Sequence, residues 1–198
     1  MKNSLLDQNY WNNRYHSGQT AWDVGAISTP LKDYIDQWKD KNSSILIPGC
    51  GNAYEAEYLL QQGYGNVTLV DIAPAAVETV STKLKDFLGK QLHIICGDFF
   101  ELQDKFDLII EQTLFCALGP ALRKAYANKM FDLLKDDGKL VGVLFNRHFE
   151  GGPPFGGSKA EYEQLFTTSF AIIKMEDCRN SIAPRADSEL FFILKKKR

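Results

Sequence analysis

Residues 44–52 of the chain read Ser44-Ile45-Leu46-Ile47-Pro48-Gly49-Cys50-Gly51-Asn52. The apolar run at 45–47 predicts a short buried strand that breaks into a glycine turn, and a helix is predicted at 53–62 directly after it. Gly49 and Gly51 lack a Cβ, so the backbone can turn sharply there and lie against a ligand. Such a turn also places a helix N-terminus at the end of a strand, where parallel α/β sheets bind nucleotide-like ligands.

Apolar runs alternate with amphipathic stretches on both sides of this turn. Strands are predicted at 45–47, 67–71, 92–96, 106–111 and 139–145, and helices at 4–16, from about 30, 53–62, 74–87, 121–135 and 158–166. Asp136-Asp137-Gly138 is expected to separate the helix at 121–135 from the strand at 139–145, and the glycines and prolines of 151–157 predict a loop. Late strands at 170–176 and 189–195 have no helix between them, so we expect them to pair antiparallel. The predicted fold is α/β, a Rossmann-like doubly wound sheet of seven mostly parallel strands with an antiparallel C-terminal pair.

Composition predicts one globular domain spanning residues 1–198. The chain is 44% apolar and 24% charged, and its net charge of −2 gives no electrostatic case for nucleic acid or a membrane surface. The N-terminus carries no apolar run, so neither a signal peptide nor a spanning helix is expected. The four cysteines are widely spaced, which predicts no metal site and fits reduced thiols in a cytoplasmic protein. A monomer is favoured.

Polar side chains follow three of the predicted strands. Asp71 lies at the end of the strand after the glycine turn, where a carboxylate can accept hydrogen bonds from both hydroxyls of a ribose. Asp98 and Phe99 follow the third strand, where an adenine would lie if the ribose sat on Asp71. Glu111 and Gln112 end the fourth strand, opposite the glycine turn, and are expected to face the crevice. The alternatives are a capping or solvated acid at Asp71, and a turn acid with a core ring at Asp98 and Phe99.

These motifs together resemble those of class I S-adenosylmethionine-dependent methyltransferases. The resemblance is carried in order and spacing by Gly49-Cys50-Gly51, Asp71, Gly97-Asp98-Phe99 and the segment 133–138. Within that superfamily the chain is similar to the thiopurine S-methyltransferase family, most closely its halide/thiol methyltransferase branch. Three segments indicate this family: Trp11, Tyr15 and Trp22 at the family's aromatic spacing, Phe115-Cys116-Ala117-Leu118, and His148 followed by Gly152-Pro153-Pro154-Phe155.

The resemblance implies S-adenosylmethionine as cofactor and a set of contacts to it. Residues 1–40 would form an N-terminal helical cover over the cofactor. The implied cofactor-binding residues are Trp11, Tyr15 and Trp22 in that cover, Gly49 and Gly51 near the methionine moiety, Asp71 on the ribose, Asp98 and Phe99 at the adenine, and Gln112 on the methionine side. Arg123 and His148 are the candidates for substrate contact. Phe145 stands where the plant enzymes have a tyrosine, which removes a hydroxyl near the substrate.

Physical reasoning also favours an aromatic cover. A sulfonium is a cation, and the face of an aromatic ring attracts a desolvated cation by roughly 0.5–2 kcal/mol. Core packing is the alternative explanation of these aromatic residues. The predicted reaction is in-line methyl transfer to a small soft nucleophile, a thiol, bisulfide, thiocyanate, halide or thiopurine, which needs no strong general base. The competing hypotheses are a nicotinamide-dependent oxidoreductase and a non-catalytic cofactor-binding protein on the same fold.

Overall fold

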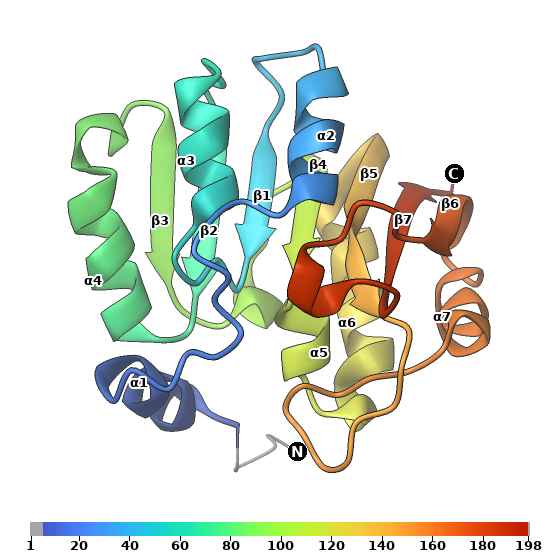
Figure 1. Ribbon diagram of the computed structural model, residues 1–198. Helices are drawn as coiled ribbons and strands as arrows, with labels where there is room; N and C mark the ends of the chain where they lie inside the picture. The colour runs from blue at the N-terminus through green and yellow to red at the C-terminus, as the bar shows by residue number, and fades with distance from the viewer. Residues whose placement is uncertain (1–5, 198) are drawn as a thin grey trace.

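The computed structural model describes residues 6–197 and contains one seven-stranded sheet with helices on both faces (Figure 1). The strands are β1 (Ile45–Pro48), β2 (Val67–Asp71), β3 (Leu92–Cys96), β4 (Phe106–Gln112), β5 (Leu134–Phe145), β6 (Phe170–Asp177) and β7 (Glu189–Lys196). The α-helices are α1 (Gln8–His16), α2 (Thr29–Gln37), α3 (Tyr54–Gln61), α4 (Pro74–Lys83), α5 (Leu114–Ala117), α6 (Arg123–Leu133) and α7 (Lys159–Phe166). Short 3-10 helices lie at η1 (Lys85–Phe87), η2 (Phe99–Glu101), η3 (Pro120–Leu122) and η4 (Ala183–Arg185).

The strand order across the sheet is β3-β2-β1-β4-β5-β7-β6. Strands β1 to β5 pair in parallel, whereas β7 pairs antiparallel with both β5 and β6. The predicted fold class and the antiparallel C-terminal pair are therefore confirmed. The chain winds outward from β1 in one direction to β3 and then from β4 in the other, so the carboxyl ends of β1 and β4 form the switch point at which such sheets bind ligands.

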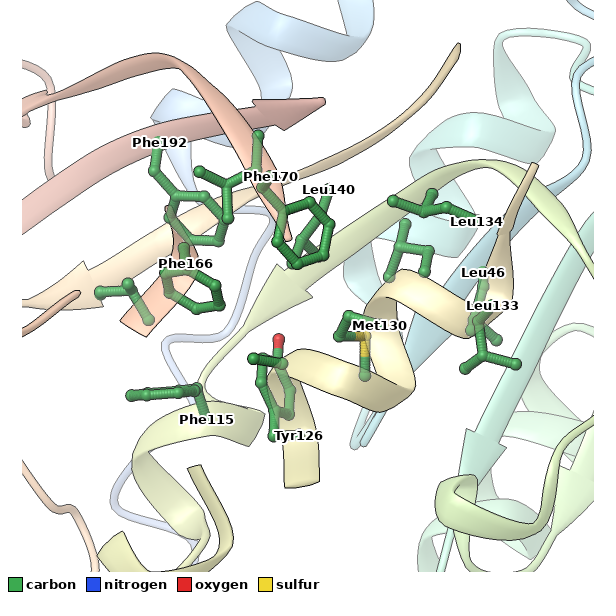
Figure 2. Close-up of a cluster of buried hydrophobic side chains, with 14 of the residues drawn as sticks. Leu46, Phe115, Tyr126, Met130, Leu133, Leu134, Leu140, Phe166, Phe170 and Phe192 are labelled. Carbon is green, nitrogen blue, oxygen red and sulfur yellow. The ribbon is translucent and has the colours of Figure 1, made fainter. Parts of the chain in front are cut away.

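Two buried clusters cover the two faces of the sheet. Helices α2, α3 and α4 pack on one face, through residues such as Leu31, Leu59 and Val80. Helices α6 and α7 pack on the other face, where Figure 2 shows Phe166 of α7 beside Phe192 of β7 and Tyr126 of α6 beside Phe115. The central strands β1 and β2 are buried along their whole length between these layers, which explains why β1 is an apolar run without alternation, whereas the edge strand β3 is partly exposed.

Local signals explain where several helices begin. A capping box begins α7: the Ser158 hydroxyl accepts from the Glu161 N–H, and the Glu161 carboxylate accepts from the Ser158 N–H. Helix α2 begins at Thr29, after Ser28, with Pro30 in its first turn. The predicted helix at 74–87 ends as an α-helix at Lys83 and continues as η1. The first predicted helix begins at Gln8; residues 4 and 5 lie outside the described residues.

One predicted boundary is wrong. Asp136-Asp137-Gly138 does not separate a helix from a strand, because β5 already begins at Leu134. Leu134 is fully buried and pairs with Phe106, and the next pair is Leu108 with Lys139. The three residues therefore form part of an irregularity inside the strand, where Asp137 has a φ of 66°. Because Leu134 is buried in the sheet, β5 begins before residues 136–138 and not after them.

Candidate functional site

The glycine turn after β1 has a left-handed geometry that favours glycine. Gly49 and Gly51 have φ of 61° and 51°, in the left-handed region. A Cβ at Gly49 would lie 2.9 Å from Cδ1 of Leu114, and one at Gly51 would lie 3.0 Å from the Tyr15 hydroxyl. The turn therefore needs glycine both for its backbone conformation and for the close approach of neighbouring side chains.

Asp71 is joined directly to this turn. Its Oδ2 accepts from the Gly51 N–H at 2.9 Å and its Oδ1 accepts from the Ala73 N–H at 2.9 Å. Burial raises the pKa of Asp71, and the two N–H donors oppose that rise. Each carboxylate oxygen has a further lone pair, so Asp71 can accept additional hydrogen bonds. The carboxylate and the glycine turn thus form one unit at the carboxyl ends of adjacent strands.

The three aromatic residues before β1 gather into one ring cluster. The Trp22 ring centroid lies 5.6 Å from that of Trp11 and 5.8 Å from that of Tyr15, each pair edge to face. All three rings are half-buried, and none belongs to either of the two buried core clusters among the described residues. Burial and the nearby Asp71 carboxylate raise the pKa of Tyr15. Core packing therefore does not account for this cluster, which we call the aromatic cover (Trp11, Tyr15 and Trp22).

Polar contacts fasten the segment that carries the aromatic cover. The Asp23 carboxylate accepts from the Asn52 amide and, at 3.2 Å, from the Tyr54 hydroxyl at the start of α3. Asn12 Oδ1 accepts from the Ala75 N–H in the first turn of α4 at 2.8 Å. Figure 1 shows α1 lying beneath α4 at the carboxyl edge of the sheet. Helix α2 is attached to the sheet by apolar contacts instead, because its Leu31 and Ile35 side chains are buried against the sheet.

A third contact comes from the connection between β6 and β7. Arg185 Nη2 donates to the Trp22 carbonyl at 2.7 Å, and Arg185 Nη1 lies 3.4 Å from Glu189 Oε1. The Arg185 guanidinium also lies 5.6 Å from the centroid of the Phe145 ring. The C-terminal part of the chain thus reaches the aromatic cover.

Two cavities lie beside Tyr15 of α1. The first, of about 60 Å³, lies between the aromatic cover and the glycine turn. Its lining includes Trp22, Asp23, Gly49, Cys50, Glu55, Gln112 and Thr113. The second, of about 390 Å³, is a groove lined by Tyr15, His16, Thr20, Asn52, Ala75, Glu78 and Thr79. Tyr15 contributes to both cavities, so its side chain stands at their common wall.

The predicted residues at the ends of β3 and β4 are only partly brought to this site. Gln112 lines the first cavity, and its Oε1 accepts from the Ser28 hydroxyl at 3.0 Å. Glu111 does not face the crevice as expected: it is fully buried, because adjacent residues of a strand point to opposite faces. Asp98 accepts from the Phe100 N–H at 3.0 Å and so caps η2. The Phe99 ring is only 6% exposed and packs 4.1 Å from that of Phe100, so its ring belongs to the core.

The two candidate substrate contacts lie apart from the first cavity. Arg123 Nη2 donates to the Gly156 carbonyl at 2.5 Å and its guanidinium lies 5.1 Å from the Phe115 ring centroid. Arg123 therefore holds the glycine- and proline-rich loop after β5. His148 is exposed in that same connection. In the part of the chain that the structure describes, neither residue lines the first cavity.

Sequence reasoning missed Asp23, Glu55 and Arg185. Trp22 and Arg185 are 163 positions apart, and no local motif indicates their contact. Across residues 6–197, no three or more His, Cys, Asp or Glu side chains gather in a way that could hold a metal ion. The same residues include no helix long and apolar enough to cross a membrane.

The known proteins whose sequences are similar to this chain are methyltransferases. The family model for thiopurine S-methyltransferase matches residues 6–193. A probable thiol methyltransferase 2 of Arabidopsis thaliana is 32% identical over 184 residues, covering 90% of this chain and 81% of that protein. Thiocyanate methyltransferase 1 of Brassica oleracea is 29% identical, covering 93% and 83% respectively.

Solved structures show the same fold. The 1,6-didemethyltoxoflavin-N1-methyltransferase of Burkholderia thailandensis, solved with S-adenosylhomocysteine, superposes with a TM-score of 0.77 at 19% identity, covering 98% of this chain and 89% of that one. The magnesium protoporphyrin IX methyltransferase of Synechocystis, solved with bound S-adenosylmethionine, gives a TM-score of 0.73 at 14% identity, covering 96% and 95%.

Proposed function

The chain belongs to the thiopurine S-methyltransferase family of S-adenosylmethionine-dependent methyltransferases, and from that membership we propose that it methylates a small soft nucleophile. The acceptor class comprises thiols, bisulfide, thiocyanate, halides and thiopurines. Family membership does not favour the nicotinamide-dependent oxidoreductase weighed as an alternative.

The observation that carries this proposal is the junction of Asp71 with the glycine turn beneath the aromatic cover. The Gly51 N–H and the Ala73 N–H orient the Asp71 carboxylate, whose remaining lone pairs can accept from both ribose hydroxyls. With the ribose there, the methionine end of the cofactor would lie along Gly49 and Gln112, and the adenine would lie towards Asp98. The Phe99 ring would take no part, because it is packed in the core, so any contact to the adenine falls to its backbone.

The aromatic cover suits the sulfonium of this cofactor. The Arg14 guanidinium lies 5.6 Å from the centroid of the Trp22 ring, so this ring already attracts a cation. A sulfonium brought under Trp22 would gain the same attraction. Closure of the cover would also exclude water from the reacting atoms.

The reaction itself asks mainly for positioning. The acceptor atom attacks the methyl carbon in line with the breaking bond to sulfur, and holding the two in that geometry removes much of the entropic barrier. The lining of the first cavity includes Cys50, Glu55 and Gln112, which supports this cavity as the space in which the two would meet. We propose that this cavity, once enlarged by movement of Tyr15, holds the methyl group and the acceptor.

Calorimetric titration tests the cofactor assignment. We expect the protein to bind S-adenosylmethionine at micromolar concentrations and not to bind NADH. Asp71→Ala should weaken the binding at least about tenfold, since it removes a charged hydrogen-bond acceptor worth roughly 1.5–3 kcal/mol. Asp36→Ala is the matched control, because Asp36 lies in an exposed ion pair with Lys32 on α2. Unchanged affinity in Asp71→Ala, or binding of NADH alone, would contradict the proposal.

A further inference from the structure

Among the described residues, two carboxylates line the first cavity, Asp23 and Glu55, and Asp23 is the one that fastens the segment carrying the aromatic cover. Asp23 is committed: it accepts from the Gly25 N–H at 2.8 Å, from the Tyr54 hydroxyl at 3.2 Å and from the Asn52 amide. Glu55 is in the first turn of α3, is 5% exposed and forms part of the cavity wall.

The positive charges nearest Glu55 are paired with other acids. Arg185 acts on Glu55 through space, but its own ion pair is with Glu189 at 3.4 Å. Lys83 also acts on Glu55, and its ion pair is with Glu57 at 2.6 Å. An ionised Glu55 therefore leaves this end of the cavity negative.

The immediate environment makes the Glu55 carboxylate a stronger base than an exposed one. Burial raises the pKa of Glu55, while its own N–H, the Ser28 N–H, Arg185 and Lys83 oppose that rise. The neighbouring Cys50 thiol is neutral, because burial holds its pKa well above the usual value. The groups that act on Glu55 are the Ser28 N–H just before α2, Arg185 in η4, Lys83 in α4 and Cys50 in the glycine turn. Glu55 thus stands at the cavity wall as a basic carboxylate.

We propose that Glu55 is the proton acceptor of the reaction and that the methyl acceptor binds as a neutral thiol. This inference rests on the proposed methyl transfer. A halide or thiocyanate would enter beside a negative carboxylate in a site shielded from water, where repulsion between like charges is strong. A neutral thiol avoids that repulsion and has a proton to give.

The thiol proton passes to the Glu55 carboxylate while the sulfur lone pair forms a bond to the methyl carbon. The bond from that carbon to the sulfonium breaks, and its electron pair stays on the cofactor sulfur. The products are the methyl thioether, neutral S-adenosylhomocysteine and protonated Glu55, which returns its proton to water when the products leave.

Glu111 is a further buried acid at this end of the sheet, but its contacts are structural. Its carboxylate accepts from the Tyr126 hydroxyl at 2.9 Å and from the Phe115 N–H, and it lies in the core on the opposite face of β4. It does not belong to the lining of the cavity. Glu55 is thus the carboxylate placed for proton transfer.

The test compares Glu55→Gln with wild type on two acceptors, 2-mercaptoethanol and thiocyanate, over pH 6 to 10. At pH 7 we expect turnover of the thiol by Glu55→Gln to fall on the order of 10²-fold, the scale of lost general-base catalysis. The loss should shrink towards pH 10, where the thiol ionises in solution. Turnover of thiocyanate, which has no proton to lose, should be unchanged or higher. Glu57→Gln, on the same helix but in an ion pair with Lys83, should behave as wild type on both acceptors.

Controls separate this role from support of the fold. Affinity for S-adenosylmethionine and the midpoint of thermal unfolding should be close to wild type in Glu55→Gln, and Glu55→Asp should restore part of the thiol turnover. An equal loss on both acceptors, a loss independent of pH, or no loss with the thiol would overturn the role of Glu55. Wild-type turnover of thiocyanate but of no thiol would overturn it while leaving the proposed function intact. Absence of methyl transfer to every acceptor by the wild type would overturn the proposed function itself.

Discussion

Glu111 shows how a single buried carboxyl group shapes the end of β4. The side chain is fully buried and its oxygens accept from the Tyr126 hydroxyl and from the Phe115 N–H at the start of α5. Burial raises the pKa of Glu111 to about 7, and these donors only partly oppose the rise. A Cβ added at Gly142 on the neighbouring strand would lie 2.5 Å from the Glu111 carbonyl oxygen, so β4 and β5 approach closely beside it.

The raised pKa of Glu111 predicts a pH dependence of stability. The folded protein keeps this proton up to about pH 7, whereas the unfolded chain loses it near 4.5. Its contribution to the free energy of unfolding is therefore complete below about pH 4.5 and is lost as the pH rises through 7. Glu111→Gln cannot ionise, so urea unfolding from pH 5 to pH 8 should show a smaller fall in stability for the variant than for wild type, by up to a few kcal/mol. Parallel curves for the two proteins would contradict this assignment.

At the residue scale, the sequence allowed prediction of groups fixed by local motifs and not of groups fixed by packing. The glycine turn and Asp71 follow from strand ends and the φ that glycine permits, and the structure joins them by a hydrogen bond. Glu55 and Arg185 carry no such local signal, because their environment is made by segments far apart in the chain. Phe99 has the position in the sequence that predicts a contact with the adenine, but its ring packs in the core against Tyr126.

At the scale of elements, the segment before α2 is attached to the sheet by polar contacts at its edge. Asn12 bonds to α4, Asp23 to α3 and Trp22 to Arg185 of η4. Its aromatic rings pack on one another instead of entering a buried cluster. We infer that this segment can move without unfolding the sheet, as cofactor binding would require.

Trp22→Ala tests that inference. Loss of a cation–π contact of roughly 0.5–2 kcal/mol should weaken binding of S-adenosylmethionine about 2- to 30-fold, with little change in the midpoint of thermal unfolding. Trp38→Ala is the contrasting control, because Trp38 packs against the core and donates to the Ser43 hydroxyl at 2.9 Å. That change should lower the unfolding midpoint and leave the affinity near wild type. A loss of thermal stability in Trp22→Ala equal to that in Trp38→Ala would place Trp22 in the core.

Helices and strands were predictable where one periodicity dominates. The strands β2 and β3 coincide with their predicted ranges, since each is a short apolar run bounded by turn residues. The start of β5 was not predictable, because the burial of Leu134 depends on Phe106 in another strand. The short helix α5 was missed as well, since four residues are too few for a helical pattern to be recognised.

At the scale of the whole molecule, strand order places the site. Because β1 is flanked by β2 and β4, the glycine turn, Asp71 and Gln112 meet at one carboxyl edge of the sheet. Alternation of strands and helices in the sequence indicates a doubly wound sheet. The contact between Arg185 of the β6–β7 connection and Trp22 of the aromatic cover could not be predicted in this way, because the two residues are far apart in the chain. The C-terminal antiparallel pair thus helps to enclose the site.

The central claim is that this site moves a methyl group from S-adenosylmethionine to a soft nucleophile. Incubation with S-adenosylmethionine carrying a CD₃ methyl group and a panel of thiols, bisulfide, thiocyanate, halides and a thiopurine, followed by mass spectrometry, measures that transfer directly. We predict a product bearing one CD₃ group, formed in equal amount with S-adenosylhomocysteine and most rapidly from a thiol. Binding of S-adenosylmethionine without labelled product from any member of the panel would contradict the claim.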